Sequence, residues 1–294
     1  MFILKDLLEP LQEEFSQTKQ GQKRKYWFVY TLLAVMLPFT SSITSNLLRT
    51  LKTLFGLEIK SQRFYAFMGS TTLPWKKLWR IVWGLIPEPT VQGRIMVALD
   101  DSINPKTGKK IFGCASFHNH AAKNGQSSYL WSQCILAACL LKKVKSRWVS
   151  MPLDFRFYHM EKVIKAKKIN ATRKGKVIPF ESKMKQAGKM LKEIQKFYQK
   201  PVLAIADSWF GNDGLWSQLE RGGQGIFNLL CRMRSNITLY DFLPVPAKDE
   251  PRKVGRPGKY GAKLGSVDDC AMRYRDRAQS YNVNLYGKDR EVLA

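Results

Sequence analysis

Arg94-Ile-Met-Val-Ala-Leu-Asp100 and Pro201-Val-Leu-Ala-Ile-Ala-Asp207 are two short apolar runs, and each of them ends in an aspartate. Continuous runs of Val, Ile, Leu and Ala are typical of strands that are buried on both faces of a sheet. An acid that ends such a strand lies at the rim of the sheet, where open α/β folds bind ligands. If the two strands are neighbours, Asp100 and Asp207 meet at one point.

Two interpretations of these aspartates stay open at this stage. Paired carboxylates are hard oxygen ligands that suit Mg²⁺ or Mn²⁺, so Asp100 and Asp207 are candidate metal ligands. In a chain this basic, the expected substrate of such a metal is a phosphodiester. The alternative is that each Asp starts a turn or caps a helix, because 101–105 and 208–212 both have the composition of turns.

The charge of the chain favours a polyanionic partner. Its 294 residues include 49 Lys and Arg but 23 Asp and Glu, which gives a net charge of +26. Such an excess indicates nucleic acid or an acidic membrane surface. The longest apolar stretch, 26–39, is shorter than the roughly 18 residues that span a bilayer. We therefore expect DNA rather than a membrane as the partner.

The cysteines indicate a reducing compartment. The five cysteines form no Cys-x-x-Cys pair, and the start of the chain lacks the basic segment of a signal peptide. Both features fit a cytoplasmic protein. Cys114, His118 and His120 are a possible zinc cluster, but zinc needs about four ligands and no further pair follows. A packed turn or strand end is the favoured interpretation of that cluster.

Residues 1–88 are predicted to form a helical, DNA-binding domain. Apolar spacing predicts its helices at 5–15, 26–37, 44–55, 61–69 and 74–83. The last two, joined by Gly69-Ser70-Thr71-Thr72, resemble a helix-turn-helix, which makes Lys76, Lys77 and Arg80 candidate DNA contacts. The alternative is an ordinary bundle with a solvated basic face. Pro87-Glu88-Pro89 is the expected domain boundary.

Residues 89–234 are predicted to form an α/β core, a mixed sheet flanked by helices. Strands are expected at 94–100, 111–117, 147–157, 201–207 and 225–233, and helices at 181–198 and 213–221, while 129–141 fits either. We interpret the order as β–β–β–α–β–α–β, with acids on the first and fourth strands. This order resembles an RNase H-like core, in which those two strands are adjacent.

Residues 235–294 are predicted to form a basic loop and a β-rich insertion. Within Arg252-Lys-Val-Gly-Arg-Pro-Gly-Lys259, Gly-Arg-Pro resembles the core of an AT-hook, although Val254 replaces the usual Arg. Phosphate contacts without base recognition are the favoured alternative. Residues 270–293 are expected to form two strands with a turn near 287–289. The candidate DNA contacts in basic loops are Arg173, Lys174, Arg252, Lys253, Arg256 and Lys259, and 142–147 is a further basic loop.

Several of these motifs together resemble DDE transposases of the IS4-like or IS701-like insertion-sequence group. They are Met96-Val-Ala-Leu-Asp-Asp-Ser102, Ala204-Ile-Ala-Asp-Ser-Trp-Phe-Gly-Asn212 and the basic stretch 255–261. The resemblance implies that Asp100 and Asp207 are the first two catalytic acids, holding Mg²⁺ or Mn²⁺, and that Asp101 has a supporting role. It also implies double-stranded DNA partners (transposon ends and target), a homodimer on DNA, and a bacterial, nucleoid-associated location.

The chain departs from this family pattern at the third acid. The family carries a Glu on a helix after the insertion, within a spaced Tyr-…-Arg-…-Glu-…-Lys signature, whereas Glu291 falls on an expected strand. We therefore expect the chain to stop before that helix and to be catalytically incomplete. One alternative is a non-catalytic DNA-binding fragment. Another is an unrelated RNase H-like nuclease with Asp213, Asp268 or Asp269 as third acid, although none has a typical helix context.

Overall fold

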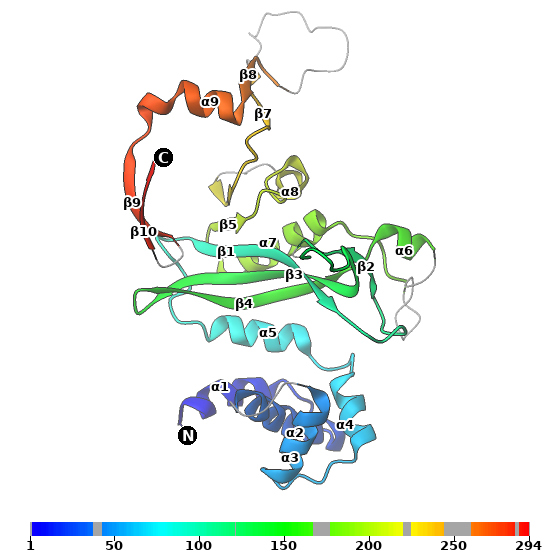
Figure 1. Ribbon diagram of the computed structural model, residues 1–294. Helices are drawn as coiled ribbons and strands as arrows, with labels where there is room; N and C mark the ends of the chain where they lie inside the picture. Colours follow the sequence, from blue (N-terminus) through cyan, green and yellow to red (C-terminus); the bar gives the residue numbers. More distant parts are fainter. Residues whose placement is uncertain are drawn as a thin grey trace, which may run out of the picture.

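The chain folds into a helical bundle, a mixed sheet and a C-terminal segment, which follow one another from bottom to top in Figure 1. The computed structural model describes residues 2–37, 43–120, 122–166, 177–219, 225–243, 260–285 and 288–293.

The N-terminal region is helical, as the apolar spacing predicts. Its helices are α1 (Phe2–Glu13), α2 (Lys19–Met36), α3 (Thr44–Thr53), α4 (Ser61–Met68) and α5 (Trp75–Gly84). Their apolar faces meet in one cluster in which Leu47, Leu51 and Phe64 are fully buried. Helix α2 begins well before the predicted Tyr26, because the Thr18 hydroxyl caps it by accepting the Gly21 N–H. Among the described helices, none combines the length and apolarity needed to cross a membrane.

Helix α5 lies between the bundle and the sheet (Figure 1). Leu78 belongs to the cluster of the bundle, whereas Trp83 belongs to the cluster of the sheet. The indole N–H of Trp83 donates to the Leu153 carbonyl over 2.8 Å, and its ring stacks on Tyr198. Helix α5 thus contributes to both cores. The division of the chain into domains 1–88, 89–234 and 235–294 stays a prediction.

The described residues place six strands in one mixed sheet, of order β2-β3-β1-β5-β6, with β4 also paired to β3. The strands are β1 (Ile95–Pro105), β2 (Ala115–His118), β3 (Tyr129–Val144), β4 (Arg147–Tyr158), β5 (Val202–Ala206) and β6 (Phe227–Cys231). Strand β1 is antiparallel to β3 and parallel to β5, and β5 is parallel to β6. The acid-bearing strands are therefore neighbours, and the predicted RNase H-like α/β fold is confirmed.

Three details of the sheet differ from the prediction. The ambiguous run 129–141 is a strand, β3, because it pairs with β1 on one edge and with β2 and β4 on the other. Because β3 adds a strand to the predicted order, the second acid follows the fifth strand in the chain rather than the fourth. The predicted turn at 101–105 is wrong, because β1 continues through these residues, which pair with 132–136 of β3.

One face of the sheet carries the core. In β1 the residues Ile95, Val97 and Leu99 are buried, while Met96 and Ala98 between them are half-buried. The buried residues of β1 pack against α7 (Lys183–Tyr198), which contributes the fully buried Met190, Leu191 and Ile194. The spacing of apolar residues predicted this helix at nearly the same bounds, 181–198. The short helices α6 (Glu161–Lys165) and α8 (Asp213–Trp216) flank α7 in the chain.

The C-terminal segment contains a helix that the prediction missed. Its elements are β7 (Thr238–Tyr240), β8 (Lys263–Ser266), α9 (Val267–Arg273), β9 (Ser280–Leu285) and β10 (Lys288–Leu293). The expectation of a strand from Cys270 is wrong, because Ser266 and Asp269 form a capping box that starts α9. The paired strands predicted further on are confirmed as β9 and β10. Of the predicted turn, 287 lies outside the described residues and 288–289 belong to β10.

Candidate metal centre

The register of β1 and β5 brings Asp100 and Asp207 together. Leu99 pairs with Ala206 in the parallel ladder, so the next residue on each strand is the aspartate. Side chains alternate along a strand, and Leu99 and Ala206 both pack on the core with α7. Asp100 and Asp207 therefore project from the opposite face, at the same end of adjacent strands. Both side chains are exposed, so they are accessible to an ion and a large substrate.

Each of these carboxylates is oriented by a backbone N–H close to it in the chain. The Asp101 N–H donates to Asp100 Oδ1 over 2.8 Å. The Trp209 N–H donates to Asp207 Oδ1 over 3.0 Å. Such hydrogen bonds restrict the rotation of a carboxylate. The two acids thus have defined orientations.

The turn after Asp207 is confirmed, and it coexists with the pairing of the two acids. Phe210 anchors this turn in the core, where it is 1% exposed. Gly211 is required beside β6, because a Cβ there would lie 2.3 Å from Cys231 Sγ. Asn212 then caps α8 by accepting the Gly214 N–H over 2.7 Å. Asp207 therefore starts a turn and also lies at the same end of the sheet as Asp100, so the two sequence interpretations are compatible.

Asp101 points to the other side of the sheet. Its Oδ2 forms an ion pair with Lys183 Nζ at 2.8 Å and accepts a weak hydrogen bond from Cys134 Sγ at 3.7 Å. Burial raises the pKa of the Cys134 thiol to about 11, so this thiol is neutral at physiological pH. Burial acts to lower the pKa of Lys183, but the hydrogen bond to Asp101 and the electrostatic attraction of Cys134, Asp101 and Tyr158 together outweigh it, so this pKa lies above its ordinary value. The Lys183 ammonium is therefore charged at physiological pH.

A cavity of about 710 Å³ lies beside this ion pair. Its lining includes Asp101, Lys183, Trp209 and the two histidines His118 and His120, whose ring centroids are 4.6 Å apart. No group of three or more His, Cys, Asp or Glu that could hold a metal occurs within the described ranges. The zinc alternative for Cys114, His118 and His120 therefore gains no support from the structure.

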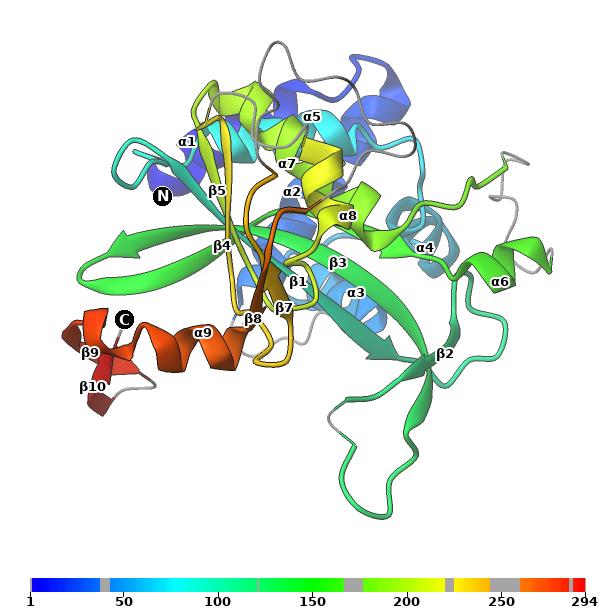
Figure 2. The same ribbon diagram turned by 90° about the horizontal axis from the view of Figure 1, so that it is seen from above.

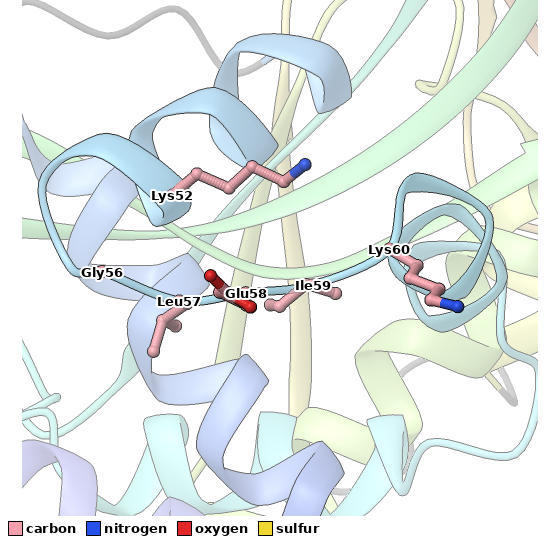
Figure 3. Close-up of a pocket in the computed structure, with 6 residues that line it drawn as sticks. All are labelled: Lys52, Gly56, Leu57, Glu58, Ile59 and Lys60. Carbon is pink, nitrogen blue, oxygen red and sulfur yellow. The ribbon is translucent and has the colours of Figure 1, made fainter.

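Another hollow, of about 520 Å³, lies on the helical bundle between α3 and α4 (Figure 3). Its lining residues come from the end of α3 and the connection to α4: Lys52, Gly56, Leu57, Glu58, Ile59 and Lys60. Leu57 and Ile59 are buried in the core of the bundle, and Gly56 has a positive φ of 63°. The hollow thus follows from how the chain turns between two helices, and it contains neither candidate metal ligand.

The candidates for a third acid occupy helix starts, contrary to the prediction that they lack a helix context. Asp213 is the first residue of α8, and Asp268 and Asp269 lie in the first turn of α9. Asp269 accepts the Ser266 N–H, and hydrogen bonds from Ser266 lower its pKa. Its carboxylate therefore caps a helix. Glu291 lies on β10, as predicted, and bonds to the Ser280 hydroxyl.

The structure describes three of the predicted DNA contacts. Lys76, Lys77 and Arg80 lie on α5 and are exposed. Lys77 forms an ion pair with Glu14 at 3.0 Å, which leaves its role in DNA binding a prediction. The other predicted contacts lie outside the described residues: Arg173, Lys174, Arg252, Lys253, Arg256 and Lys259. The AT-hook-like Gly-Arg-Pro at 255–257 also lies outside the described residues.

The basic loop predicted at 142–147 is the tip of the β3–β4 hairpin. Lys145 and Ser146, with φ of 45° and 66°, form its two-residue turn. Pairing of β1 with β3 begins at Leu140, so the tip extends beyond β1 (Figures 1 and 2). Lys143, Lys145 and Arg147 are exposed there, and Trp148 is 56% exposed. This tip is a projecting basic arm with an aromatic side chain.

Comparison with known families agrees with this geometry. A family model described as DDE superfamily endonuclease matches residues 10–284. The match covers nearly the whole chain, so the protein belongs to the DDE superfamily endonucleases. No curated protein sequence matches the chain. The family membership confirms the DDE class that the aspartate motifs predicted.

Proposed function

We propose that this chain is a DNA transposase of an IS4-like or IS701-like insertion sequence, which cuts and transfers DNA strands with a divalent metal. The observation that carries the proposal is that Asp100 and Asp207 each directly follow the last pair, Leu99 and Ala206, of the parallel ladder of β1 and β5. The family adds that the substrate is a nucleic-acid strand. The net charge of +26 suits a polyphosphate partner.

The two acids fit Mg²⁺ or Mn²⁺ by their chemistry. They offer exposed carboxylate oxygens on one face, and hard divalent ions prefer such ligands. Bound there, the metal would supply activation of water or of a DNA 3′-OH and stabilisation of the leaving oxygen. Asp100 and Asp207 would hold it, oriented by the N–H groups of Asp101 and Trp209. The described residues assign no third acid, and an incomplete site is part of the proposal.

The proposed partners are double-stranded DNA at the transposon ends and at the target, bound by a homodimer. The basic arm at the β3–β4 tip and the cations of α5 are exposed and suit phosphate contacts, which position DNA without reading its sequence. A protein that acts on bacterial DNA in this way would work in the cytoplasm, at the nucleoid. The reduced cysteines of the described residues are compatible with that location.

Nicking of supercoiled plasmid with Mn²⁺ tests the proposal. The wild-type protein is compared with Asp100→Ala at equal concentration, and DNA binding is measured for both. Metal-dependent nicking that disappears in the variant supports a cleaving transposase with a complete site and contradicts the expectation of an incomplete one.

The second candidate function is a non-catalytic DNA-binding fragment of such an enzyme. It is favoured by the lack of a third acid beside Asp100 and Asp207 in the described part of the chain. No nicking by either protein, with salt-sensitive DNA binding retained by both, would establish this function instead.

Charge reversal at the basic arm is expected to weaken DNA binding. Replacing Lys143 and Arg147 with Glu removes two exposed cations. The dependence of log Kd on log salt should fall by about 0.9 for each phosphate that the arm no longer neutralises. Fluorescence anisotropy with a labelled duplex at several salt concentrations measures this slope.

The matched control for the arm is Lys196→Glu with Lys200→Glu, which reverses two exposed cations at and just after the C-terminal end of α7. Its salt slope should equal that of the wild-type protein. Equal slopes for the arm variant and the wild type would contradict a role of the arm in DNA binding.

A further inference from the structure

Lys183 occupies an enclosed position at the start of α7. Its side chain is 17% exposed, and its ammonium is 2.8 Å from Asp101 Oδ2. The same ammonium lies 5.2 Å from the centroids of the Tyr158 and Trp209 rings. Ammonium groups at this distance from aromatic faces gain cation–π attraction. Three groups from three parts of the chain therefore hold one lysine.

The position of Lys183 is unfavourable for the helix itself. Ser182 caps α7 by accepting the Lys185 N–H, which places Lys183 in the first turn. The positive end of the helix dipole disfavours a cation there. The interactions of the ammonium with Asp101 and the two rings offset this effect. A lysine is therefore stable at this position because of its tertiary contacts and not because of the helix.

The neighbours of Lys183 lead to both candidate metal ligands. Asp101, its ion-pair partner, donates its backbone N–H to Asp100. Trp209, whose ring faces the ammonium, donates its backbone N–H to Asp207. The two residues that orient the carboxylates are thus joined through one side chain, although Asp101 lies on β1 and Trp209 lies in the turn after β5.

We propose that Lys183 is a positioning residue that sets the relative placement of Asp100 and Asp207 for the metal. This inference rests on the proposed function. Without the ammonium, the Asp101 carboxylate loses its ion-pair partner, and a half-buried charge without its partner is costly. The Trp209 ring loses its cation–π interaction as well. Asp101 and Trp209, whose N–H groups orient the two carboxylates, are therefore both less firmly held. Lys183 contacts neither carboxylate, so its effect passes through these neighbours.

Mn²⁺ binding to the DNA-free protein, followed by electron paramagnetic resonance, tests this role without relying on cleavage. Lys183→Met is expected to weaken Mn²⁺ binding by about 10–100-fold, the usual cost of removing a residue that orients metal ligands. Lys183→Arg should recover part of the affinity, because it keeps the charge. The matched control is Lys185→Met, which removes an exposed cation from the same helical turn and should bind Mn²⁺ like the wild type.

Trp209→Leu tests the same role with a second variant, in case Lys183→Met does not fold. This ring is 42% exposed, so its replacement removes the cation–π interaction with little change in core packing, and Mn²⁺ binding should again weaken. Wild-type Mn²⁺ affinity in Trp209→Leu, or in Lys183→Met with native circular dichroism, would overturn the inference.

Asp100→Asn separates this inference from the proposed function. If Asp100→Asn abolishes Mn²⁺ binding while the Lys183 and Trp209 variants bind normally, the positioning role alone fails. If Asp100→Asn also binds Mn²⁺ normally, the proposed metal site fails and the inference fails with it.

Discussion

Asp100→Asn and Asp207→Asn are each expected to weaken Mn²⁺ binding by at least about 100-fold. Removing a residue that only orients a metal ligand already lowers metal affinity by about 10–100-fold, and these changes remove the ligands themselves. Each change removes a negative charge and keeps the shape of the side chain. The amide oxygen can still accept the N–H of Asp101 or Trp209, so the backbone should stay in place. Titration followed by electron paramagnetic resonance measures the affinity. DNA binding should be unchanged, because the proposed DNA contacts are exposed cations elsewhere in the chain.

The control for the acid variants is Asp276→Asn. Asp276 lies on the 3-10 turn Arg275–Arg277, outside the sheet, and is also exposed. This variant should bind Mn²⁺ as the wild type does. If all three variants bound Mn²⁺ equally weakly, general charge rather than a defined site would explain the metal binding.

Trp83→Ala is expected to destabilise the protein by about 3–5 kcal/mol, the usual cost of truncating a buried aromatic residue. Trp83 is 5% exposed and packs in the core of the sheet. Its indole N–H donates to the Leu153 carbonyl, which would be left without that donor. Because Trp83 joins α5 to the sheet, the substitution should also loosen the helical bundle. Urea unfolding followed by circular dichroism measures the change.

Trp148→Ala provides the comparison for the buried tryptophan. Trp148 is 56% exposed at the tip of the β3–β4 hairpin, so its truncation should change stability by less than about 0.5 kcal/mol. Similar effects of the two substitutions would show that α5 is not anchored to the sheet through Trp83.

The aspartate strands and the helical region could be predicted from local patterns. A continuous apolar run ending in Asp predicted both β1 and β5, and their adjacency followed from the order of the elements. The capping box of Ser266 and Asp269 was also readable, because Ser-x-x-Asp is a known helix start, and overlooking it caused the error at α9.

Features that depend on distant partners could not be predicted from the sequence. Strand β1 continues past Asp100 because β3 supplies hydrogen-bond partners for 101–105, which local turn composition does not indicate. Lys183 looks like an ordinary surface lysine at a helix start, because its partner Asp101 lies 82 positions earlier. Its significance depends on three interactions that form only in the folded sheet.

The most direct test of the central claim is cleavage of the protein backbone by Fe²⁺ bound in place of Mg²⁺, with ascorbate and peroxide. Hydroxyl radicals formed at the metal cut nearby peptide bonds, and mass spectrometry locates the cuts. If Asp100 and Asp207 hold one ion, the protein should be cut near both residues, and Asp207→Asn should abolish both cuts. Cuts elsewhere, or a cut near Asp100 that persists in Asp207→Asn, would contradict a shared metal site.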